Sequence, residues 1–482
     1  MAYRYGNRDQ MAMFPRSIEE YVAQDHPVRA YDAFVEALDF QDLGIELDPE
    51  KVGNAAYDPQ TMLKLLVYGY SYGVRSSRKL ERETHDNLSF IWLLGGLQPD
   101  HKTIAEFRRK NKQALKKVLK QCVRLCIQLN LIAGNALFVD GTRIRANASR
   151  SQAHDQAYYE NQLTEIESRI DQLLEECEAL DQQEEGSASW VALDKKLVQA
   201  QTLKEKVHQV LKAFPEKGRD QLNRTDPDCA LMRSIQGSHA GYNVQSVVDD
   251  QHGLIVQAEA VSETSDVNQF ARQIDQANEQ LKRPCESACA DAGYADTDEL
   301  HKIDTQGIKV IVPSQRQALH QEEGPFSKSR FSYDPEQDRY ICPEGHGLSY
   351  TGTDQSSGKR HYQITHRNLC LSCPHYGVCT TAKKGRKITR LALEEVKERL
   401  EAQYQEASSQ EVYKRRKERV EHPYGHIKRN LKFDAFLLRG SSGVNAETSL
   451  LATCFNLIRM MTILGVSGLI QKLRRVYVPV AA

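Results

Sequence analysis

The sequence predicts an α/β protein with a helical N-terminal domain, a mixed-sheet core and two insertions. Three observations lead to this prediction. Residues 1–130 have helical patterns separated by turn signals, residues 131–320 alternate apolar strand-like runs with helical segments, and the chain is helical again from about Leu391. With 482 residues, the chain is long enough for about two to four compact units.

The composition is that of an ordinary globular protein, with 40% hydrophobic and 27% charged residues. No apolar run approaches the roughly 20 residues that cross a bilayer, and the first residues, MAYRYGNRDQ, lack the zones of a secretory signal. We therefore expect a cytoplasmic protein with no membrane partner.

The net charge of -1 conceals a strong asymmetry. Eleven acidic residues and one basic residue lie between positions 155 and 185, whereas nine basic and three acidic residues lie between positions 413 and 439. A nucleic acid is bound by a local basic patch and does not sense the average charge. The second segment is therefore a candidate DNA-binding surface.

Capping signals predict the helices of the N-terminal domain, residues 1–130. Asp58 precedes Pro59 at one start, and Asp100 or Thr103 can cap the helix that carries Arg108. The segment 63–82 combines apolar and basic residues. It could present a basic face to DNA or simply a solvated face.

The core begins with the apolar run LFVD, which predicts a buried strand with Asp140 at or near its end, before a turn or second strand. Residues 241–261 predict a hairpin that turns at 249–253, and a helix at 266–281 and a strand at 309–313 follow. This order is typical of an α/β nuclease core.

Two periodic apolar stretches within residues 155–221 predict a helical hairpin, interrupted by EEGS at 184–187. The hairpin could be an arm, a dimer contact or a purely structural element.

The eleven cysteines do not form a disulfide scaffold, but four of them are grouped. Cys342 is followed by Cys370, Cys373 and Cys379, with one CxxC spacing, which is typical of a structural Zn²⁺ site. His346 or His375 could replace one thiolate, and free buried thiols are the alternative.

Three acidic residues are candidate ligands for two divalent metals. Phosphoryl transfer by a metal pair needs carboxylates that leave positions open for water and phosphate, and Mg²⁺ prefers oxygen ligands. Asp140 follows a strand and Asp291 lies in CADAGY, although either could be a turn residue. Glu421 lies on one predicted helical face with Tyr413 and Lys417, and Lys428 stays near this face if Pro423 does not break the helix; a basic helix with an incidental salt bridge is the alternative.

Several stretches together resemble bacterial insertion-sequence transposases of the DDE class. They are YDPQTMLKLLVYGYSYGVRSSRKLERETHDNLSF, PDHKTIAEFRR, FVDGTRIRANAS, GYNVQSVVD, ADAGYAD and RRKERVEHPYGHIKRNLKF. The resemblance implies an RNase H-like catalytic core at 131–320 and 385–465, with the helical hairpin at 155–221 inserted in it. It also implies a zinc-ribbon-like insertion at 325–384 and matches the catalytic acids to Asp140, Asp291 and Glu421.

The same resemblance implies the activity and its partners. We expect cleavage and strand transfer at the ends of an insertion sequence, with two Mg²⁺ (or Mn²⁺) ions and a structural Zn²⁺. The partners would be double-stranded DNA, as terminal inverted repeats and target, and a second copy in a synaptic homodimer in the bacterial cytoplasm, associated with the nucleoid. The expected DNA contacts are Tyr413, Arg416, Lys417, Lys428, Arg429 and Arg108. A nuclease that cuts without joining and an inactive, domesticated DNA-binding protein are the alternatives.

The arginine expected four residues before the glutamate is Lys417 here, and Arg416 is one position away. Because lysine offers a point charge in place of a planar fork, either residue could make the phosphate contact.

Overall fold

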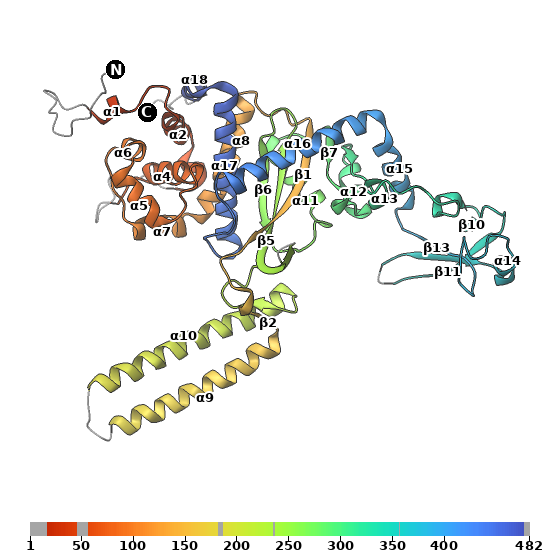
Figure 1. Ribbon diagram of the computed structural model, residues 1–482, viewed down its shortest axis with the longest axis horizontal. Coiled ribbons are helices and arrows are strands. Elements are labelled where there is room, and N and C mark those ends of the chain that lie inside the picture. Colours follow the sequence, from red (N-terminus) through yellow and green to blue (C-terminus); the bar gives the residue numbers. More distant parts are fainter. Residues whose placement is uncertain (1–16, 46–55, 182–186, 235–236, 356, 477–482) are drawn as a thin grey trace, which may run out of the picture. The chain divides into compact units, whose positions relative to one another are not determined.

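The computed structural model describes residues 17–45, 56–181, 187–234, 237–355 and 357–476 (Figure 1). The chain divides into two compact units. The first comprises Met1–Asp266, Arg272–Cys285 and Arg415–Ala482, and the second comprises Val267–Ala271 and Glu286–Lys414. Each unit is described by itself below.

The first unit begins with a helical domain, as the sequence predicts. Its helices are α1 (Ile18–Tyr21), α2 (Pro27–Glu36), α3 (Phe40–Leu43), α4 (Pro59–Ser71), α5 (Ser77–Asp86), α6 (Leu88–Leu93), α7 (His101–Lys110) and α8 (Lys112–Gln128). Asp58 caps α4 by accepting hydrogen bonds from the amides of Gln60 and Thr61. Asp100, and not Thr103, caps α7: its carboxylate accepts from the Thr103 amide at 2.6 Å. Residues 1–16 and 46–55 lie outside the described residues.

The sheet of the first unit is antiparallel and built around strand β5. Its strands are β1 (Ala136–Arg145), β4 (Ala230–Ser234), β5 (Gly237–Asp249) and β6 (Ile255–Val261). The prediction that Asp140 ends its strand is wrong, because β1 continues to Arg145 and Asp140 pairs with Ser246 in its middle. A Cβ on Gly241 of β5 would lie 2.7 Å from the Ile144 carbonyl oxygen, so glycine permits this close pairing.

Helix α17 (Gly440–Leu464) covers the edge of β6 (Figure 1). The side-chain amide of Asn456 bonds both the amide and the carbonyl of Ile255, at 2.8 Å each. Asn445, three turns earlier, does the same with Ala260, at 2.9 and 3.0 Å. Two asparagines thus satisfy backbone groups that an edge strand would otherwise expose. Two further helices are α11 (Phe270–Leu281) and α18 (Val466–Val476), and α18 packs against α2 and α17.

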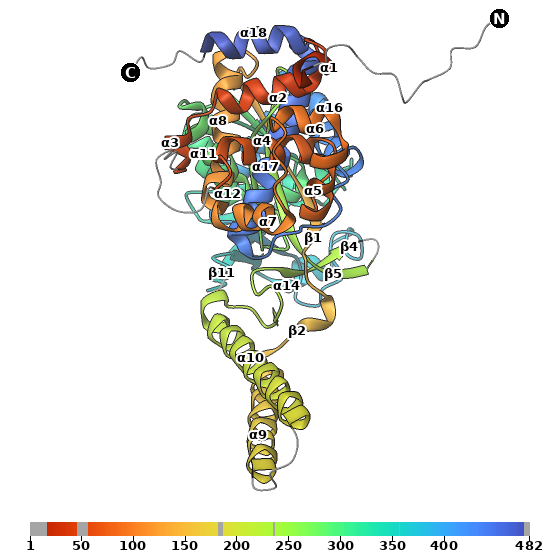
Figure 2. The ribbon, with the colours of Figure 1, turned by 90° about the vertical axis from the view of Figure 1, so that its left-hand side faces the viewer.

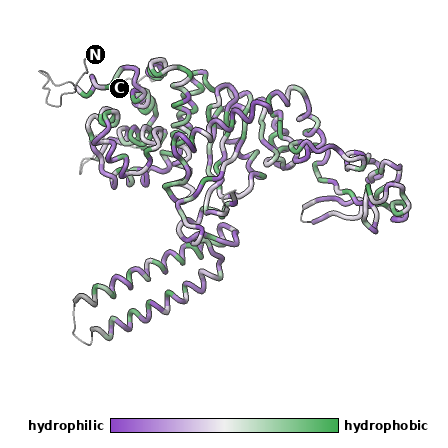
Figure 3. Tube along the Cα trace, in the orientation of Figure 1, coloured by the Kyte–Doolittle hydropathy of each residue, from purple (hydrophilic) through white to green (hydrophobic). Residues whose placement is uncertain are grey.

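The predicted helical hairpin is present as α9 (Gln156–Asp181) and α10 (Ser187–Lys217), which lie side by side (Figures 1 and 2). Figure 3 shows hydrophobic and hydrophilic residues alternating along both helices, as expected for a two-helix seam. Tyr159, Ile166, Val207, Val210, Phe214 and Leu222 form the buried cluster at its base. The elements that flank the base are η1 (Arg150–Gln152), β2 (Ala153–His154) and β3 (Leu222–Asn223). The predicted break at 184–186 lies outside the described residues.

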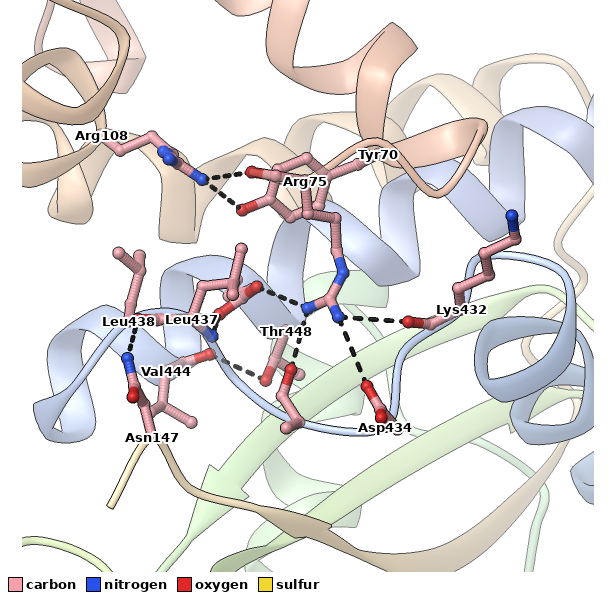
Figure 4. A network of polar contacts seen from close by, with 12 residues as sticks. Tyr70, Arg75, Arg108, Asn147, Lys432, Asp434, Leu437, Leu438, Val444 and Thr448 are labelled. Atoms are coloured by element: carbon pink, nitrogen blue, oxygen red, sulfur yellow. Dashed lines mark hydrogen bonds and ion pairs between the residues drawn. The ribbon is translucent and has the colours of Figure 1, made fainter. Parts of the chain in front are cut away.

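A buried ion pair joins the N-terminal domain to α17 (Figure 4). Nη1 of Arg75 lies 3.0 Å from Glu447, and these side chains are 9% and 0% exposed. The same guanidinium donates to the carbonyls of Ala435 and Lys432. Glu447 also accepts from the backbone amides of Leu437 and Leu438, in the loop just before α17. The loop that leads from α16 (Ala407–Arg429) into α17 is therefore anchored to the N-terminal domain.

The second unit contains a parallel strand pair and a separate antiparallel sheet. The pair is β7 (Ser287–Cys289) and β8 (Lys309–Ile311), and the nearby helices are η2 (Ala292–Tyr294), α12 (Thr297–Asp304), α13 (Gln315–Ala318) and α15 (Glu394–Gln405). The antiparallel sheet consists of β9 (Ser332–Asp334), β10 (Arg339–Ile341), β11 (Gly347–Thr353), β12 (Arg360–Ile364) and β13 (Lys387–Arg390), with η3 (Lys328–Arg330) and α14 (Arg367–Leu371). The antiparallel sheet extends past residue 384, where the sequence placed the end of the insertion.

Over the described ranges, no individual helix has the length and apolar composition to span a membrane; α17 and α18 pass that test only jointly, across a bend of 110°.

Candidate active site

Asp140, in the middle of strand β1, contacts helix α16. One of its carboxylate oxygens lies 2.8 Å from Nη2 of Arg416, and the two side chains are 20% and 12% exposed. The phenol of Tyr424 donates to the Asp140 carbonyl and to the Val244 carbonyl, at 2.9 Å each. Both the side chain and the backbone of Asp140 therefore contact α16.

Helix α16 continues through Pro423, so residues on both sides of the proline share one face. Arg416 and Tyr424 are eight residues apart and both contact Asp140. Four residues further, Lys428 Nζ donates to the Thr142 hydroxyl at 2.5 Å. Lys428 thus stays beside β1, as expected if Pro423 does not break the helix.

Glu421 lies on α16 between Arg416 and Lys428, and its side chain is exposed. It precedes Tyr424 by three residues, which is about 4.5 Å along a helix axis, and precedes Lys428 by seven residues, or about two turns. Glu421 is therefore next to the face of α16 that contacts β1, in the same unit as Asp140.

The electrostatic environment is dominated by burial. Burial lowers the pKa of Lys428, and the Asp140 charge opposes this shift. Burial raises the pKa of the Tyr424 phenol well above its usual value, and Asp140 raises it further. Tyr424 is therefore a neutral hydrogen-bond donor at physiological pH.

Sequence reasoning did not single out Asp250, which anchors the opposite side of α16. Its carboxylate lies 2.9 Å from Arg415 and 3.4 Å from Arg419. The spacing of four residues between these arginines, on one helical face, is the signal that an acidic partner would be nearby.

Asp291 belongs to the second unit and lies two residues after the end of β7. Its carboxylate accepts a hydrogen bond from the Gly293 amide at 2.8 Å and caps η2. A Cβ at position 293 would lie 2.9 Å from that carboxylate oxygen, so glycine allows the close approach. That Asp291 lies close enough to Asp140 and Glu421 to share metal ions with them stays a prediction.

The other predicted DNA contacts have different environments. Lys417 and Arg429 are exposed on α16, and Tyr413, in the second unit, packs edge-on against Tyr404 at 5.2 Å between ring centres. Arg108 is a correction: it is only 5% exposed and donates to the Arg75 carbonyl at 2.8 Å and to the Ser77 hydroxyl. Its guanidinium makes its contacts inside the helical domain, with the Tyr70 hydroxyl and the Arg75 carbonyl (Figure 4).

The four grouped cysteines line one cavity of about 30 Å³ in the second unit. Burial raises the pKa of the Cys379 thiol, and the nearby thiols of Cys370, Cys342 and Cys373 raise it further. Four thiols are the donor type that a thiophilic ion such as Zn²⁺ prefers. Among the described residues, no three His, Cys, Asp or Glu side chains have the arrangement of a metal site, so the thiols surround the cavity without a closed coordination shell.

A strand aspartate held against a basic helix that carries a glutamate is typical of an enzyme that acts on phosphodiesters. The family comparisons agree with this class. Residues 16–110 match the family model described as Transposase domain (DUF772), and residues 341–461 match the model described as Transposase DDE domain. Together the two matches support an insertion-sequence transposase of the DDE class. It matches none of the curated proteins or solved structures with which it was compared.

The second match includes all of α16 and most of α17, so Glu421 and Lys428 lie within it. The predicted class and α/β fold with an RNase H-like core are confirmed. Transposases of this class act on DNA and use divalent metal ions.

Proposed function

We propose that Asp140, Asp291 and Glu421 hold two Mg²⁺ (or Mn²⁺) ions and that the protein cuts and joins DNA at the ends of its insertion sequence. The contact of α16 with Asp140 carries this proposal, because it brings a basic helix and a second acid to the strand that bears the first. Carboxylates that leave open positions suit this metal pair. The bound ions would activate the attacking oxygen and neutralise charge on the phosphate.

The residues of the chain would position DNA and compensate charge, without a covalent enzyme intermediate. In the first step a water oxygen bonds to phosphorus and the bond to the 3′ oxygen breaks, leaving a 3′ hydroxyl. In the second step this hydroxyl attacks a target phosphate and displaces the target 3′ oxygen. Arg416, Lys417, Lys428 and Arg429 are the cations that we assign to phosphates, and Tyr413 to DNA near the cut.

Of the two candidates for the arginine that precedes the glutamate, we favour Arg416. Arg416 reaches the Asp140 carboxylate, whereas the Lys417 side chain is exposed to solvent. A planar guanidinium beside the metal-binding carboxylate is well suited to a phosphate that binds there.

We further assign the domains by residue range: 1–130 to DNA binding, 131–320 and 385–465 to the catalytic core, 155–221 to the arm and 325–384 to the cysteine insertion. We propose that Cys342, Cys370, Cys373 and Cys379 hold one structural Zn²⁺, because all four line one small cavity. A synaptic homodimer that pairs two terminal inverted repeats in the bacterial cytoplasm, in association with the nucleoid, completes the proposal.

The test uses a plasmid carrying the natural DNA that flanks the coding region. Asp140→Asn, Asp291→Asn and Glu421→Gln should each abolish cleavage and retain DNA binding. Glu418→Gln is the matched control, because Glu418 is 78% exposed on the same helix, three residues from Glu421. Cleavage by any of the three variants at the wild-type rate would refute its proposed role. Nicking without joining by the wild type would favour a nuclease, and no cleavage with DNA binding retained would favour a domesticated protein.

A further inference from the structure

The surface around the four cysteines is positively charged. From Thr365 to Lys387 the sequence contains no aspartate or glutamate, and it carries five cations: Arg367, Lys383, Lys384, Arg386 and Lys387. We call the residues 365–387 the knuckle surface. It is separate in sequence from α16, the basic helix of the candidate active site.

Contacts with the cysteines bring the parts of the knuckle surface together. The Arg386 amide donates to the Cys370 sulfur at 3.5 Å, and its guanidinium donates to the Cys379 carbonyl at 2.8 Å. Gly385, with φ +80°, turns the chain so closely that a Cβ would lie 3.2 Å from the Cys370 sulfur. The lysine-containing turn therefore packs its backbone against the cysteines.

Four cations of this surface are available to a partner. Arg386 is half-buried and occupied by the contacts above, but the other four are exposed and, within the described part of the chain, form no ion pair: Arg367, Lys383, Lys384 and Lys387. Glu344, the acid at the cysteine cavity, pairs with His375 at 3.2 Å. The four unpaired cations of the knuckle surface therefore outnumber this one carboxylate at the cavity.

Apolar side chains are exposed beside these cations. Val378 is 74% exposed, Leu371 is 42% exposed and Tyr376 is 36% exposed. The Tyr376 hydroxyl donates to the Thr381 carbonyl, which fixes the ring at the surface. Cations around a small exposed apolar group suit a DNA groove, where the cations meet phosphates and the apolar group meets sugars or base edges.

We propose that the knuckle surface binds the backbone of double-stranded DNA, in addition to the contacts of α16. The inference rests on the proposed function only in taking DNA as the partner, and it does not depend on which residues hold the catalytic metals. Lys383 and Lys384 supply phosphate contacts, and Val378 supplies an apolar groove contact.

The experiment measures binding of the full-length protein to a short fluorescent duplex over a series of salt concentrations. Lys383→Gln/Lys384→Gln should reduce the steepness of the negative slope of log K against log salt by about 2, because each phosphate contact contributes about 0.9 to its magnitude. Arg330→Gln/Lys359→Gln is the matched control: both residues are exposed in the same unit, and the change in net charge is equal. Val378→Ser should weaken binding without changing the slope.

An unchanged slope in the lysine variant, or an equal change in the control, would overturn the proposal. If the lysine variant loses salt-sensitive self-association in sedimentation while its DNA binding stays intact, the proposal is overturned and the knuckle surface contacts a second copy of this chain. The two proposals fail separately. If the wild type does not cleave but the lysine variant shows the reduced slope, the knuckle contact stands and the catalytic proposal falls.

Discussion

Arg416 of α16 and Asp140 of β1 form an ion pair of 2.8 Å in which both side chains are mostly buried. The Arg416 guanidinium contacts the Asp140 carboxylate, which the proposed mechanism assigns to a metal ion. A cation at this distance from a carboxylate disfavours the arrival of a second cation. Metal binding at Asp140 is therefore favoured when Arg416 moves away, and the phosphate of a DNA end is a suitable new partner for its guanidinium.

The first prediction concerns this competition. Arg416→Gln should raise the affinity of the DNA-free protein for Mn²⁺ by roughly tenfold, because one neighbouring positive charge is lost in a partly screened site. The same variant should lower cleavage, because the phosphate loses its partner. Mn²⁺ titration followed by electron paramagnetic resonance measures the affinity.

Arg415→Gln is the control for this prediction. Arg415 pairs with Asp250 at 2.9 Å, on the other side of the helix, and should leave Mn²⁺ affinity unchanged. Equal Mn²⁺ affinity in wild type and Arg416→Gln would show that the ion pair does not compete with the metal.

The second prediction concerns the buried pair of Arg75 and Glu447. Arg75→Met leaves a fully buried carboxylate without its cation and should lower the free energy of unfolding by about 3–5 kcal/mol. Arg75→Met/Glu447→Leu removes both charges and should recover part of this loss. Urea denaturation followed by tryptophan fluorescence measures both. Additive losses in the double variant would contradict the coupling.

The third prediction concerns the grouped cysteines. The purified protein should contain one zinc per chain. Cys373→Ser or a strong chelator should remove this zinc and loosen the packing of aromatic side chains in the antiparallel sheet. Metal analysis and near-ultraviolet circular dichroism measure the two effects. Cys177→Ser is the control, because Cys177 is half-buried in the arm, far along the sequence from the group. Full metal content in Cys373→Ser would exclude this cysteine as a ligand.

The sequence predicted the elements that local signals specify. Asp58 and Asp100 begin α4 and α7 as expected, because an N-cap needs only a residue two or three positions away. The helical arm follows from its apolar period. The fold class and the acids on β1 and α16 could therefore be identified before any contact was known.

Contacts between distant residues could not be predicted in this way. The sequence at Gly141 predicts a turn or a second strand. Strand β1 nevertheless continues, because β5 pairs with it as far as Arg145. Arg108 reads as a surface cation, yet the Arg75 carbonyl binds it internally. No local signal explains the polar residues Asn445 and Asn456 within an apolar helix. The structure explains them, because both accept hydrogen bonds from backbone amides of β6.

The last prediction concerns the arm. Helix α9 carries eight acidic residues and one basic residue, whereas α10 carries six basic and three acidic residues. If two copies pair their arms about a twofold axis with α9 of each against α10 of the other, opposite charges meet at the contact. Exposed Val191 and Val198, seven residues apart on α10, would lie at the same face.

Replacing residues 171–203 by a short glycine-rich linker preserves the buried base of the arm around Tyr159 and Val210. The shortened protein should fold and bind one DNA end but should no longer pair two ends. Sedimentation with DNA ends measures the complexes, and Leu131→Ala, a buried change near the core, controls for a general loss of stability. Paired-end complexes formed by the shortened protein at the wild-type level would show that the dimer contact lies elsewhere in the chain.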